Sequence, residues 1–397
     1  MGTERPLAGV RVLDLTNVLA GPFACYHLGL MGAEVSKVER PGSGDLARQL
    51  GADPARNAAG MGISFLAQNA GKKSVTLNLK AAEGRDLLHR LVSDADVLVE
   101  NYRPGVMDRL GVGYHALRAT RPELIYCAIS GFGQDGPWRD YPAYDQIVQG
   151  VSGVMSLTGD GDSAPLRVGY PLADTIGGMT AAFAIASALT DRPRGTILDV
   201  SMTEAVLATM GWVVSNHLIG GVEPLPQGNE NVTSAPSGTF ATADAPINIA
   251  ANRQEQWEAL ARHLGRETLL AHPDYATREG RKAHREALRA ELETVLRTRS
   301  AADWVRELSA LGIPTGPVLS VPDALVSDQI AGRAFVQAQR LASGEDVALT
   351  GSPVMVDGAR LGPGGPPPKL GADNAEVYGS LGLDAAARSR LTREGVI

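Results

Sequence analysis

The chain has 397 residues, of which 44% are hydrophobic and 20% charged, and its formal net charge is −7 at pH 7. This length exceeds what one hydrophobic core normally supports, so we expect two domains. The acidic balance excludes a general nucleic-acid or anionic-membrane surface, which would need an excess of basic residues, so neither kind of partner is expected.

A reducing cytoplasm is the expected location. Cys25 and Cys127 lie far apart without CxxC spacing, so neither a disulfide framework nor a zinc site is indicated, and we expect no bound metal. The N-terminus lacks a basic stretch followed by an apolar run. No segment approaches the ~20 apolar residues that a membrane span requires.

Strands and helices alternate along the first part of the chain. Short apolar runs predict strands at 10–15, 34–39, 74–79, 96–100 and 124–129. Helices are predicted at 21–32, 81–93 and 106–120. This alternation implies a parallel sheet with helices on its faces and ligands at the carboxyl ends of the strands. The expected fold class is α/β, with a large Rossmann-like parallel-sheet domain and a smaller α+β domain.

Basic residues recur beside the predicted strand ends. They are Lys37, Arg40, Lys72, Lys73, Lys80, Arg103 and Arg109. In an acidic protein this placement indicates a site for phosphate groups, because each charge-assisted hydrogen bond is worth about 1.5–3 kcal/mol. The first turn, 16–22, lacks G-x-G-x-x-G spacing, and no G-x-x-x-x-G-K-[ST] sequence occurs. Both facts weaken a nicotinamide, flavin or P-loop interpretation.

Asp174 is the most informative residue, because it places a lone carboxylate at the start of an apolar, alanine-rich helical run. Pro171 ends the preceding strand-like stretch, so Asp174 is expected at or near the helix N-cap, where the helix dipole favours an ionised carboxylate. Gly177 and Gly178 remove side chains one turn later, on the side that a ligand would approach. A nucleophile is one interpretation, and an ordinary Asp cap is the other.

The character of the chain changes near residue 220. A Pro/Gly linker at 220–228 precedes turns, short strands and amphipathic helices predicted at 254–264, 281–298 and 301–311. Trp257 and Trp304 lie on these helices and are interpreted as core anchors.

The domain organisation follows from these shifts in composition. We expect a large domain at 1–215, a small domain at 225–325 and a segment at 326–397 that returns to complete the large domain. Within this segment, the proline-rich stretch 362–369 is expected to cross a surface.

Several ordered motifs together resemble the class III CoA-transferase family, which includes formyl-CoA transferase. They occupy 7–16, 20–22, 32–42, 78–80, 99–105, 167–179, 228–238 and 312–318. The resemblance covers nearly the whole chain, and so many motifs in the same order make it highly specific.

The resemblance implies a set of site residues. The nucleophile's motif falls on Asp174. Candidates for contact with coenzyme A are Val18, Arg40, Leu77, Lys80, Asn101, Tyr102, Arg109 and Tyr144. No permanently bound cofactor is implied, since CoA and acyl-CoA are substrates, and the other partner is a small carboxylic acid. The family also implies a homodimer threaded as linked rings, with the active site between the large domain and the neighbouring chain's small domain.

The family's chemistry explains why an aspartate is needed. A serine ester would be too stable to return CoA readily, whereas a carboxylate gives a mixed anhydride about as reactive as the thioester. The site must then exclude water, because anhydrides hydrolyse quickly. Backbone N–H groups at the start of the helix are expected to stabilise the tetrahedral oxyanions.

Two alternatives keep the same CoA site. An α-methylacyl-CoA racemase would need two acid/base groups, and its Gly-His-Asp motif is replaced here by Ala143, Tyr144 and Asp145. A tyrosine is a poor general base near neutral pH, since the ordinary pKa of its phenol is about 10. A non-catalytic CoA-binding protein would keep the basic loops without needing Asp174.

The acceptor acid is less well specified than the reaction. Residues 231–238 stand where formyl-CoA transferase has a run of glycines, which argues against formate and oxalate as substrates. The breadth of the family suggests a small dicarboxylate such as succinate, malate, mesaconate or itaconate. A carnitine-type or other specialised CoA-transferase would show the same motifs.

Overall fold

The computed structural model describes residues 5–397, which form two compact units. The larger unit contains 5–154, 167–222 and 328–397, and the smaller one contains 155–166 and 223–327. The short segment 155–166 thus leaves the span predicted for the large domain and joins the smaller unit. No helix among the described residues is long and apolar enough to cross a membrane.

A six-stranded parallel sheet forms the centre of the larger unit. Its strands are β1 (Arg11–Asp14), β2 (Glu34–Glu39), β3 (Lys73–Thr76), β4 (Val97–Glu100), β5 (Ile125–Ser130) and β6 (Ile197–Ser201). They lie in the order β3-β2-β1-β4-β5-β6. The strand order reverses between β1 and β4, so a crevice for ligands is expected at their carboxyl ends. The five strands predicted from the sequence are confirmed within one to three residues at their ends.

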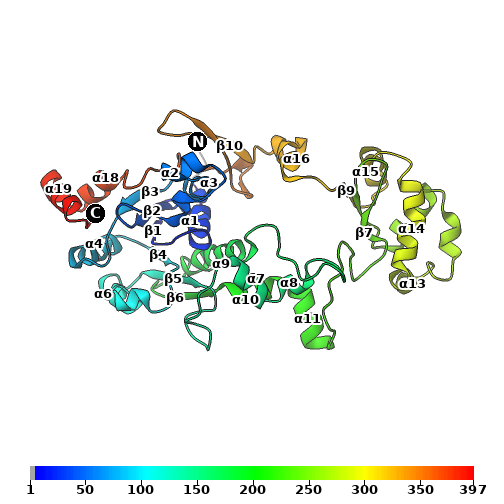
Figure 1. Ribbon diagram of the computed structural model, residues 1–397, viewed down its shortest axis with the longest axis horizontal. Helices are drawn as coiled ribbons and strands as arrows, with labels where there is room; N and C mark the ends of the chain where they lie inside the picture. Colours follow the sequence, from blue (N-terminus) through cyan, green and yellow to red (C-terminus); the bar gives the residue numbers. More distant parts are fainter. Residues whose placement is uncertain (1–4) are drawn as a thin grey trace. The chain divides into compact units, whose positions relative to one another are not determined.

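Helices cover both faces of this sheet (Figure 1). One face carries α4 (Ala82–Ser93), α5 (Val106–Arg109), α6 (Tyr114–Thr120), α18 (Asn374–Ser380) and α19 (Ala385–Arg393). The other carries α1 (Ala20–Leu30), α7 (Asp145–Val151), α9 (Leu172–Ala188) and α10 (Met202–Thr209). The single helix predicted at 106–120 is wrong, because Gly111 adopts a φ of +76° and separates α5 from α6.

Shorter elements complete the larger unit. They are η1 (Leu46–Gln49), α2 (Pro54–Ala58), α3 (Ile63–Asn69), α11 (Gly211–Gly220), α17 (Asp328–Gly332) and the antiparallel pairs β10 (Val336–Arg340) with β11 (Asp346–Thr350) and β12 (Met355–Val356) with β13 (Ala359–Arg360). Helix α8 (Val154–Leu157) starts at Val154 and continues into the segment 155–166 of the smaller unit. The proline-rich stretch runs along this unit, where Gly71 donates its N–H to the Pro366 carbonyl oxygen.

The smaller unit packs helices against a three-stranded antiparallel sheet. Its strands are β7 (Ser237–Phe240), β8 (Ile247–Ala250) and β9 (Thr315–Pro317). Its helices are α12 (Gln254–His263), η2 (Glu267–Ala271), α13 (Arg278–Ala283), α14 (Arg285–Leu296), α15 (Ala301–Ala310) and α16 (Val321–Val326). Trp257 and Trp304 are buried in its core, which confirms their interpretation as core anchors.

Candidate active site

A pocket of about 390 Å³ opens at the carboxyl ends of β1, β4, β5 and β6, where the strand order reverses. Five of the predicted site residues line it, namely Val18, Asn101, Tyr102, Tyr144 and Asp174. They come from four separate stretches of sequence that the parallel sheet brings together. The pocket therefore has the position that ligand sites take in sheets of this topology.

Asp174 is the third residue of α9, and it does not cap the helix. Pro171 occupies the N-cap and has no side-chain acceptor. The Asp174 carboxylate makes no hydrogen bond or ion pair within residues 5–397. Burial and, as the smaller cause, the nearby Asp145 carboxylate together raise the pKa of Asp174 from 3.8 to about 7. The interpretation of Asp174 as an ordinary cap is therefore wrong, and a partly buried carboxylate without a partner remains.

The cap of α9 comes from a different helix. Asp145, the first residue of α7, accepts hydrogen bonds from the N–H groups of Ala173 at 2.8 Å and Asp174 at 3.4 Å. Thr175 donates its N–H to the Pro171 carbonyl oxygen. These N–H groups are occupied, so the expectation that the start of this helix stabilises oxyanions is wrong.

A second helix begins at the same pocket with free donors. Leu19 and Ala20 line the pocket at the start of α1. Their N–H groups make no hydrogen bond within the described part of the chain. The N-terminus of a helix attracts negative charge, because unpaired N–H groups and the helix dipole act together.

Gly177 and Gly178 serve packing rather than ligand approach, contrary to the sequence prediction. A Cβ atom on Gly178 would lie 2.4 Å from the Ala20 carbonyl oxygen of α1. One on Gly177 would lie 2.7 Å from Cγ of Met202 in α10. The two glycines therefore let α9 approach α1 and α10 closely, which fixes the helix that carries Asp174.

The turn after β1 is held in an unusual conformation. Val18 has a φ of +67°, a region that costs a β-branched residue about 1–3 kcal/mol. Its N–H donates to Oδ1 of Asp45 at 2.9 Å, and Oδ2 of Asp45 pairs with Lys37 at 2.9 Å. The buried carboxylate thus compensates for the strain at a residue lining the pocket.

The loop after β4 is tied to the same turn. The Asn101 side chain accepts from the Asn17 N–H at 2.8 Å and donates to the Asn17 carbonyl oxygen at 2.8 Å. Tyr102 donates its N–H to Glu100 at 2.7 Å, and burial raises the pKa of Glu100 to about 7. The Asn101 amide is therefore used in joining the two loops at the switch point.

Two of the predicted phosphate-binding cations are structural instead. Lys37 and Lys72 are buried and pair with Asp45 and Asp14 at 2.9 and 2.8 Å. These two lysines hold the pKa of Asp14 well below its usual range, against the opposing effect of burial. Lys73 pairs with Glu34 and Glu376. The cations that remain exposed are Arg40, Lys80, Arg103 and Arg109.

The predicted CoA contacts thus fall into two groups, those that line the pocket with Asp174 and those that do not. Arg40, Lys80 and Arg109 are exposed and lie outside the lining of the pocket that holds Asp174. The Leu77 side chain is packed in the core, and its N–H donates to the Glu39 carbonyl oxygen. Tyr144, in contrast, is 70% exposed at the N-terminus of α7 and lines the pocket.

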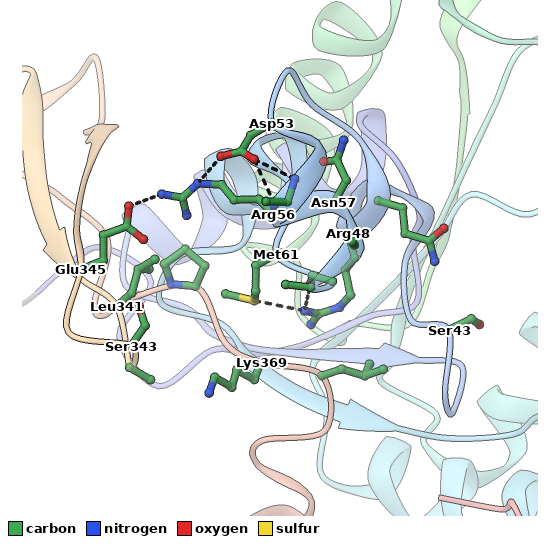
Figure 2. A pocket seen from close by; sticks show the side chains of 18 of the residues that line it. Ser43, Arg48, Asp53, Arg56, Asn57, Met61, Leu341, Ser343, Glu345 and Lys369 are labelled. Carbon is green, nitrogen blue, oxygen red and sulfur yellow. Dashed lines mark hydrogen bonds and ion pairs between the residues drawn. The ribbon is translucent and has the colours of Figure 1, made fainter.

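A larger cavity, of about 1220 Å³, lies elsewhere on the same unit (Figure 2). Its charged groups largely pair with one another: Arg56 pairs with Asp53 and with Glu345. Arg48, at its wall, pairs with Glu39 and donates to two carbonyl oxygens. None of its lining residues is a predicted site residue, so the smaller pocket is favoured on chemical grounds despite its size.

Sequence reasoning missed several residues that shape the site. They are Asn17, Asp45, Asp145, Gln149, Arg167, Ser130 and Met202. The spacing of Asp145 and Gln149, one turn apart on a helix, is a signal that could have found that pair. The contacts of Asn17, Asp45 and Arg167 depend on segments distant in sequence, which no local pattern reveals.

Comparison with known proteins agrees with the motifs. The model of CoA-transferase family III matches residues 7–374. An acetyl-CoA:oxalate CoA-transferase from Acetobacter aceti is 40% identical over 89% of this chain and 90% of its own length. A succinate–glutarate CoA-transferase from Agrobacterium fabrum is 34% identical over 95% of this chain and 96% of its own. A CaiB/BaiF family protein from Brucella suis superposes with a TM-score of 0.83 at 33% identity, over 96% of this chain and all of that one.

Proposed function

Because the chain belongs to CoA-transferase family III, we propose that it moves CoA from an acyl-CoA thioester to a free carboxylic acid through a covalent intermediate on Asp174. One observation carries the proposal. Asp174 presents a carboxylate with a raised pKa and no partner in the pocket at the switch point of the sheet. A carboxylate without hydrogen-bond donors is a better nucleophile than one stabilised by them.

The first half of the reaction frees CoA from its donor. An oxygen of Asp174 attacks the thioester carbonyl carbon, the carbon–sulfur bond breaks, and CoA leaves as a thiolate. The thiolate then attacks the aspartyl carbon of the resulting anhydride. The donor acid departs with one oxygen that came from Asp174, and the enzyme carries CoA as an aspartyl thioester.

The second half repeats these steps with the acceptor. Its carboxylate attacks the aspartyl carbon and expels the CoA thiolate, which forms a second anhydride. The thiolate attacks the acceptor's acyl carbon, so the new acyl-CoA leaves and Asp174 returns as a carboxylate. Every intermediate stays close to the thioester in reactivity, so no step dissipates the energy that must reach the product.

We propose that the free N–H groups at the start of α1 stabilise the tetrahedral oxyanions that form at the acyl carbon and at the aspartyl carbon. Those of Leu19 and Ala20 lie at the pocket, and Val18 is held in position beside them by Asp45. Donors fixed before reaction stabilise developing negative charge without reorganisation. The sequence predicts that the start of α9 stabilises the oxyanions, and we propose that the turn before α1 does so instead.

CoA itself is proposed to bind the larger unit. Arg40, Lys80 and Arg109 are exposed, and their guanidinium or amino groups have no ion-pair partner within residues 5–397. They are therefore available to the CoA phosphates, as the resemblance implies. We propose that 1–215, apart from the segment 155–166 that joins the smaller unit, forms the CoA-binding domain together with 326–397, and that 225–325 forms the small domain.

We propose a small dicarboxylate as the acceptor. The Acetobacter aceti and Agrobacterium fabrum relatives are named for oxalate and for succinate and glutarate, all of which carry two carboxylates. The proposal therefore rests on the class of acid that these relatives share. Residues 231–238 argued against oxalate as a substrate, but the relative named for oxalate makes oxalate a candidate acceptor again.

A homodimer is the proposed assembly. Phe183 of α9 and Trp212, Leu218 and Ile219 of α11 are between 73% and 88% exposed in the single chain. Large apolar side chains that a single chain leaves exposed are typical of surfaces that a partner covers. Threading of the two chains as linked rings is the arrangement that the resemblance implies.

A donor and acceptor screen tests the function. Succinyl-CoA or acetyl-CoA is mixed with each of several mono- and dicarboxylic acids, and new acyl-CoA species are measured by mass spectrometry. We expect transfer to at least one dicarboxylate by the wild type and none by Asp174→Ala, which should still bind CoA. Retention of more than a few per cent of wild-type turnover by Asp174→Ala would overturn the assignment of the nucleophile.

A further inference from the structure

Helix α7 carries two polar side chains that are buried one turn apart. Asp145 is 7% exposed and Gln149 is fully buried. Buried polar groups of this kind are costly unless they are hydrogen-bonded. Both are fully engaged, and nearly all their contacts go to one stretch of chain, residues 167–174.

Asp145 contacts both ends of this stretch. One carboxylate oxygen accepts from the N–H groups of Ala173 at 2.8 Å and Asp174 at 3.4 Å. The other accepts from the Arg167 guanidinium at 3.2 Å and from the Gln149 amide at 2.8 Å. A single carboxylate thus joins the residue that opens the segment to the residue that closes it.

Gln149 holds the middle of the same segment. Its side-chain oxygen accepts from the Val168 N–H at 2.9 Å, and its amide nitrogen donates to the Tyr170 carbonyl oxygen at 3.2 Å. The backbone leading into α9 is therefore fixed at four successive places by two side chains. The helix has no side-chain cap of its own, so its first turn depends on α7.

The placement of Asp145 has an electrostatic consequence. A helix N-terminus normally stabilises a carboxylate in its first turn through free N–H groups and the helix dipole. Here Asp145 occupies those donors with its own negative charge, within 3.4 Å of the Asp174 nitrogen. Arg167 neutralises Asp145 only from its far oxygen. Asp174 is thus denied the stabilisation that its position in the helix would give it.

We propose that Asp145 and Gln149 are positioning residues that clamp the segment 167–174 and keep Asp174 nucleophilic by withholding the α9 N-terminus from it. This inference rests on the proposed function of Asp174. Two parts can be separated: Gln149 fixes geometry, and Asp145 adds charge to geometry. The raised pKa of Asp174, caused by burial and then by Asp145, agrees with the second part.

Other ionisable groups surround α9 without binding its nucleophile. The lining of the pocket contributes Tyr102, Arg103 and Tyr144. The remaining elements packed against α9 contribute Tyr26, His27, Cys25, Tyr126, Cys127, Asp199 and Glu204. None of these groups hydrogen-bonds or pairs with the Asp174 carboxylate within residues 5–397. Asp145 is the charged neighbour that acts on it.

Three variants test the proposal through the pH dependence of transfer. Asp145→Asn keeps an oxygen acceptor for the α9 N–H groups and removes the charge. Gln149→Met keeps the volume and removes the amide. Asp384→Asn is the matched control, because Asp384 caps α19 through the Ala387 N–H at 2.8 Å without contacting the site.

In the wild type, kcat should rise with pH as Asp174 ionises through its pKa of about 7. For Asp145→Asn we expect that midpoint to fall by about one pH unit and kcat on the alkaline plateau to fall about tenfold, with little change in the KM for acyl-CoA. For Gln149→Met we expect a loss of kcat of about tenfold with the midpoint unchanged, because displacement of a reacting group is costly. Asp384→Asn should match the wild type.

An unchanged midpoint in Asp145→Asn would overturn the electrostatic part, and a wild-type kcat in Gln149→Met would overturn the geometric part. Should the wild type show no Asp174-dependent transfer, the proposed function fails independently. The clamp is then tested through the pH dependence of the free energy of unfolding. The wild type compared with Asp174→Asn gives the contribution of Asp174 when Asp145 is present, and Asp145→Asn compared with Asp145→Asn/Asp174→Asn gives it when Asp145 is absent. We expect the loss of stability caused by ionisation of Asp174 to occur at lower pH in the second pair. The same comparison serves if the variants turn over too slowly to measure. Absence of that shift to lower pH contradicts the proposal.

Discussion

Replacing Asp174 by asparagine should stabilise the protein at alkaline pH, even though it abolishes transfer. The folded protein raises the pKa of Asp174 from 3.8 to about 7, mainly by burial and then by the charge of Asp145. An acid whose pKa is higher in the folded state binds its proton more tightly there than in the unfolded chain. Its favourable contribution is complete below pH 3.8 and is lost as pH rises through about 7.

The magnitude follows from that interval. Each pH unit between the two pKa values is worth about 1.4 kcal/mol, so complete exclusion of water would make ionised Asp174 cost about 4 kcal/mol. Asp174 is only partly buried in an open pocket. We therefore expect about 2 kcal/mol, since solvent screens a group of this exposure.

The assay is urea unfolding of the wild type and Asp174→Asn across the range from pH 4 to 8.5. At pH 4 Asp174 is protonated in the folded protein, so the difference between the two free energies of unfolding is close to its low-pH limit. The asparagine variant should then gain about 2 kcal/mol relative to the wild type by pH 8.5. A difference that stays constant with pH, or that moves in favour of the wild type, would refute the account of a desolvated carboxylate.

Three further outcomes test other parts of the account. Neutralising Arg40, Lys80 or Arg109 should raise the KM for acyl-CoA by the equivalent of about 1.5–3 kcal/mol, with a smaller effect on kcat. The control Lys369→Met, in the larger cavity, should change neither constant. Unaltered CoA affinity in all three variants would show that these cations are solvated loop residues. An enantiopure 2-methylacyl-CoA should take up no deuterium from heavy water, in the wild type or in Tyr144→His, because CoA transfer breaks no carbon–hydrogen bond, whereas rapid uptake by the wild type without an acceptor acid would identify a racemase. Gly178→Ala should lower the free energy of unfolding by about 1–3 kcal/mol, since its Cβ would meet the Ala20 carbonyl oxygen. The control Gly332→Ala in α17 places its Cβ near no other atom and should not lower the free energy of unfolding in this way. Equal effects of the two substitutions would contradict the packing described for α9.

The central strands of the sheet were predictable because they are buried on both faces. β4 is buried along its whole length, and β5 at every residue but the last. Such strands appear in the sequence as short continuous apolar runs. Buried helices are usually longer than these runs, so the length of a run distinguishes a strand from a helix. The break between α5 and α6 was equally visible, since Gly111 and Gly113 interrupt the apolar pattern, but the repeat on either side was given more weight.

The site was predictable only where a residue acts alone. Asp174 could be singled out from its sequence context. That Asp174 does not cap α9 could not be predicted, because the capping carboxylate is Asp145, which lies on another helix 28 residues from Ala173. The roles of Lys37 and Lys72 depend on how closely Asp14 and Asp45 approach them in space. A basic residue after a strand looks the same in the sequence whether it meets a phosphate or a buried carboxylate.

The central claim is that Asp174 carries the acyl group or CoA during turnover, and hydroxylamine tests it most directly. The enzyme is mixed with acyl-CoA and hydroxylamine, digested with trypsin and analysed by tandem mass spectrometry. Asp174 lies in the tryptic peptide 168–194, because cleavage does not occur between Arg192 and Pro193. We predict a hydroxamate on Asp174, not on Asp191 of the same peptide, and only when acyl-CoA is present. An unmodified Asp174 in an enzyme that transfers CoA under the same conditions would contradict the account.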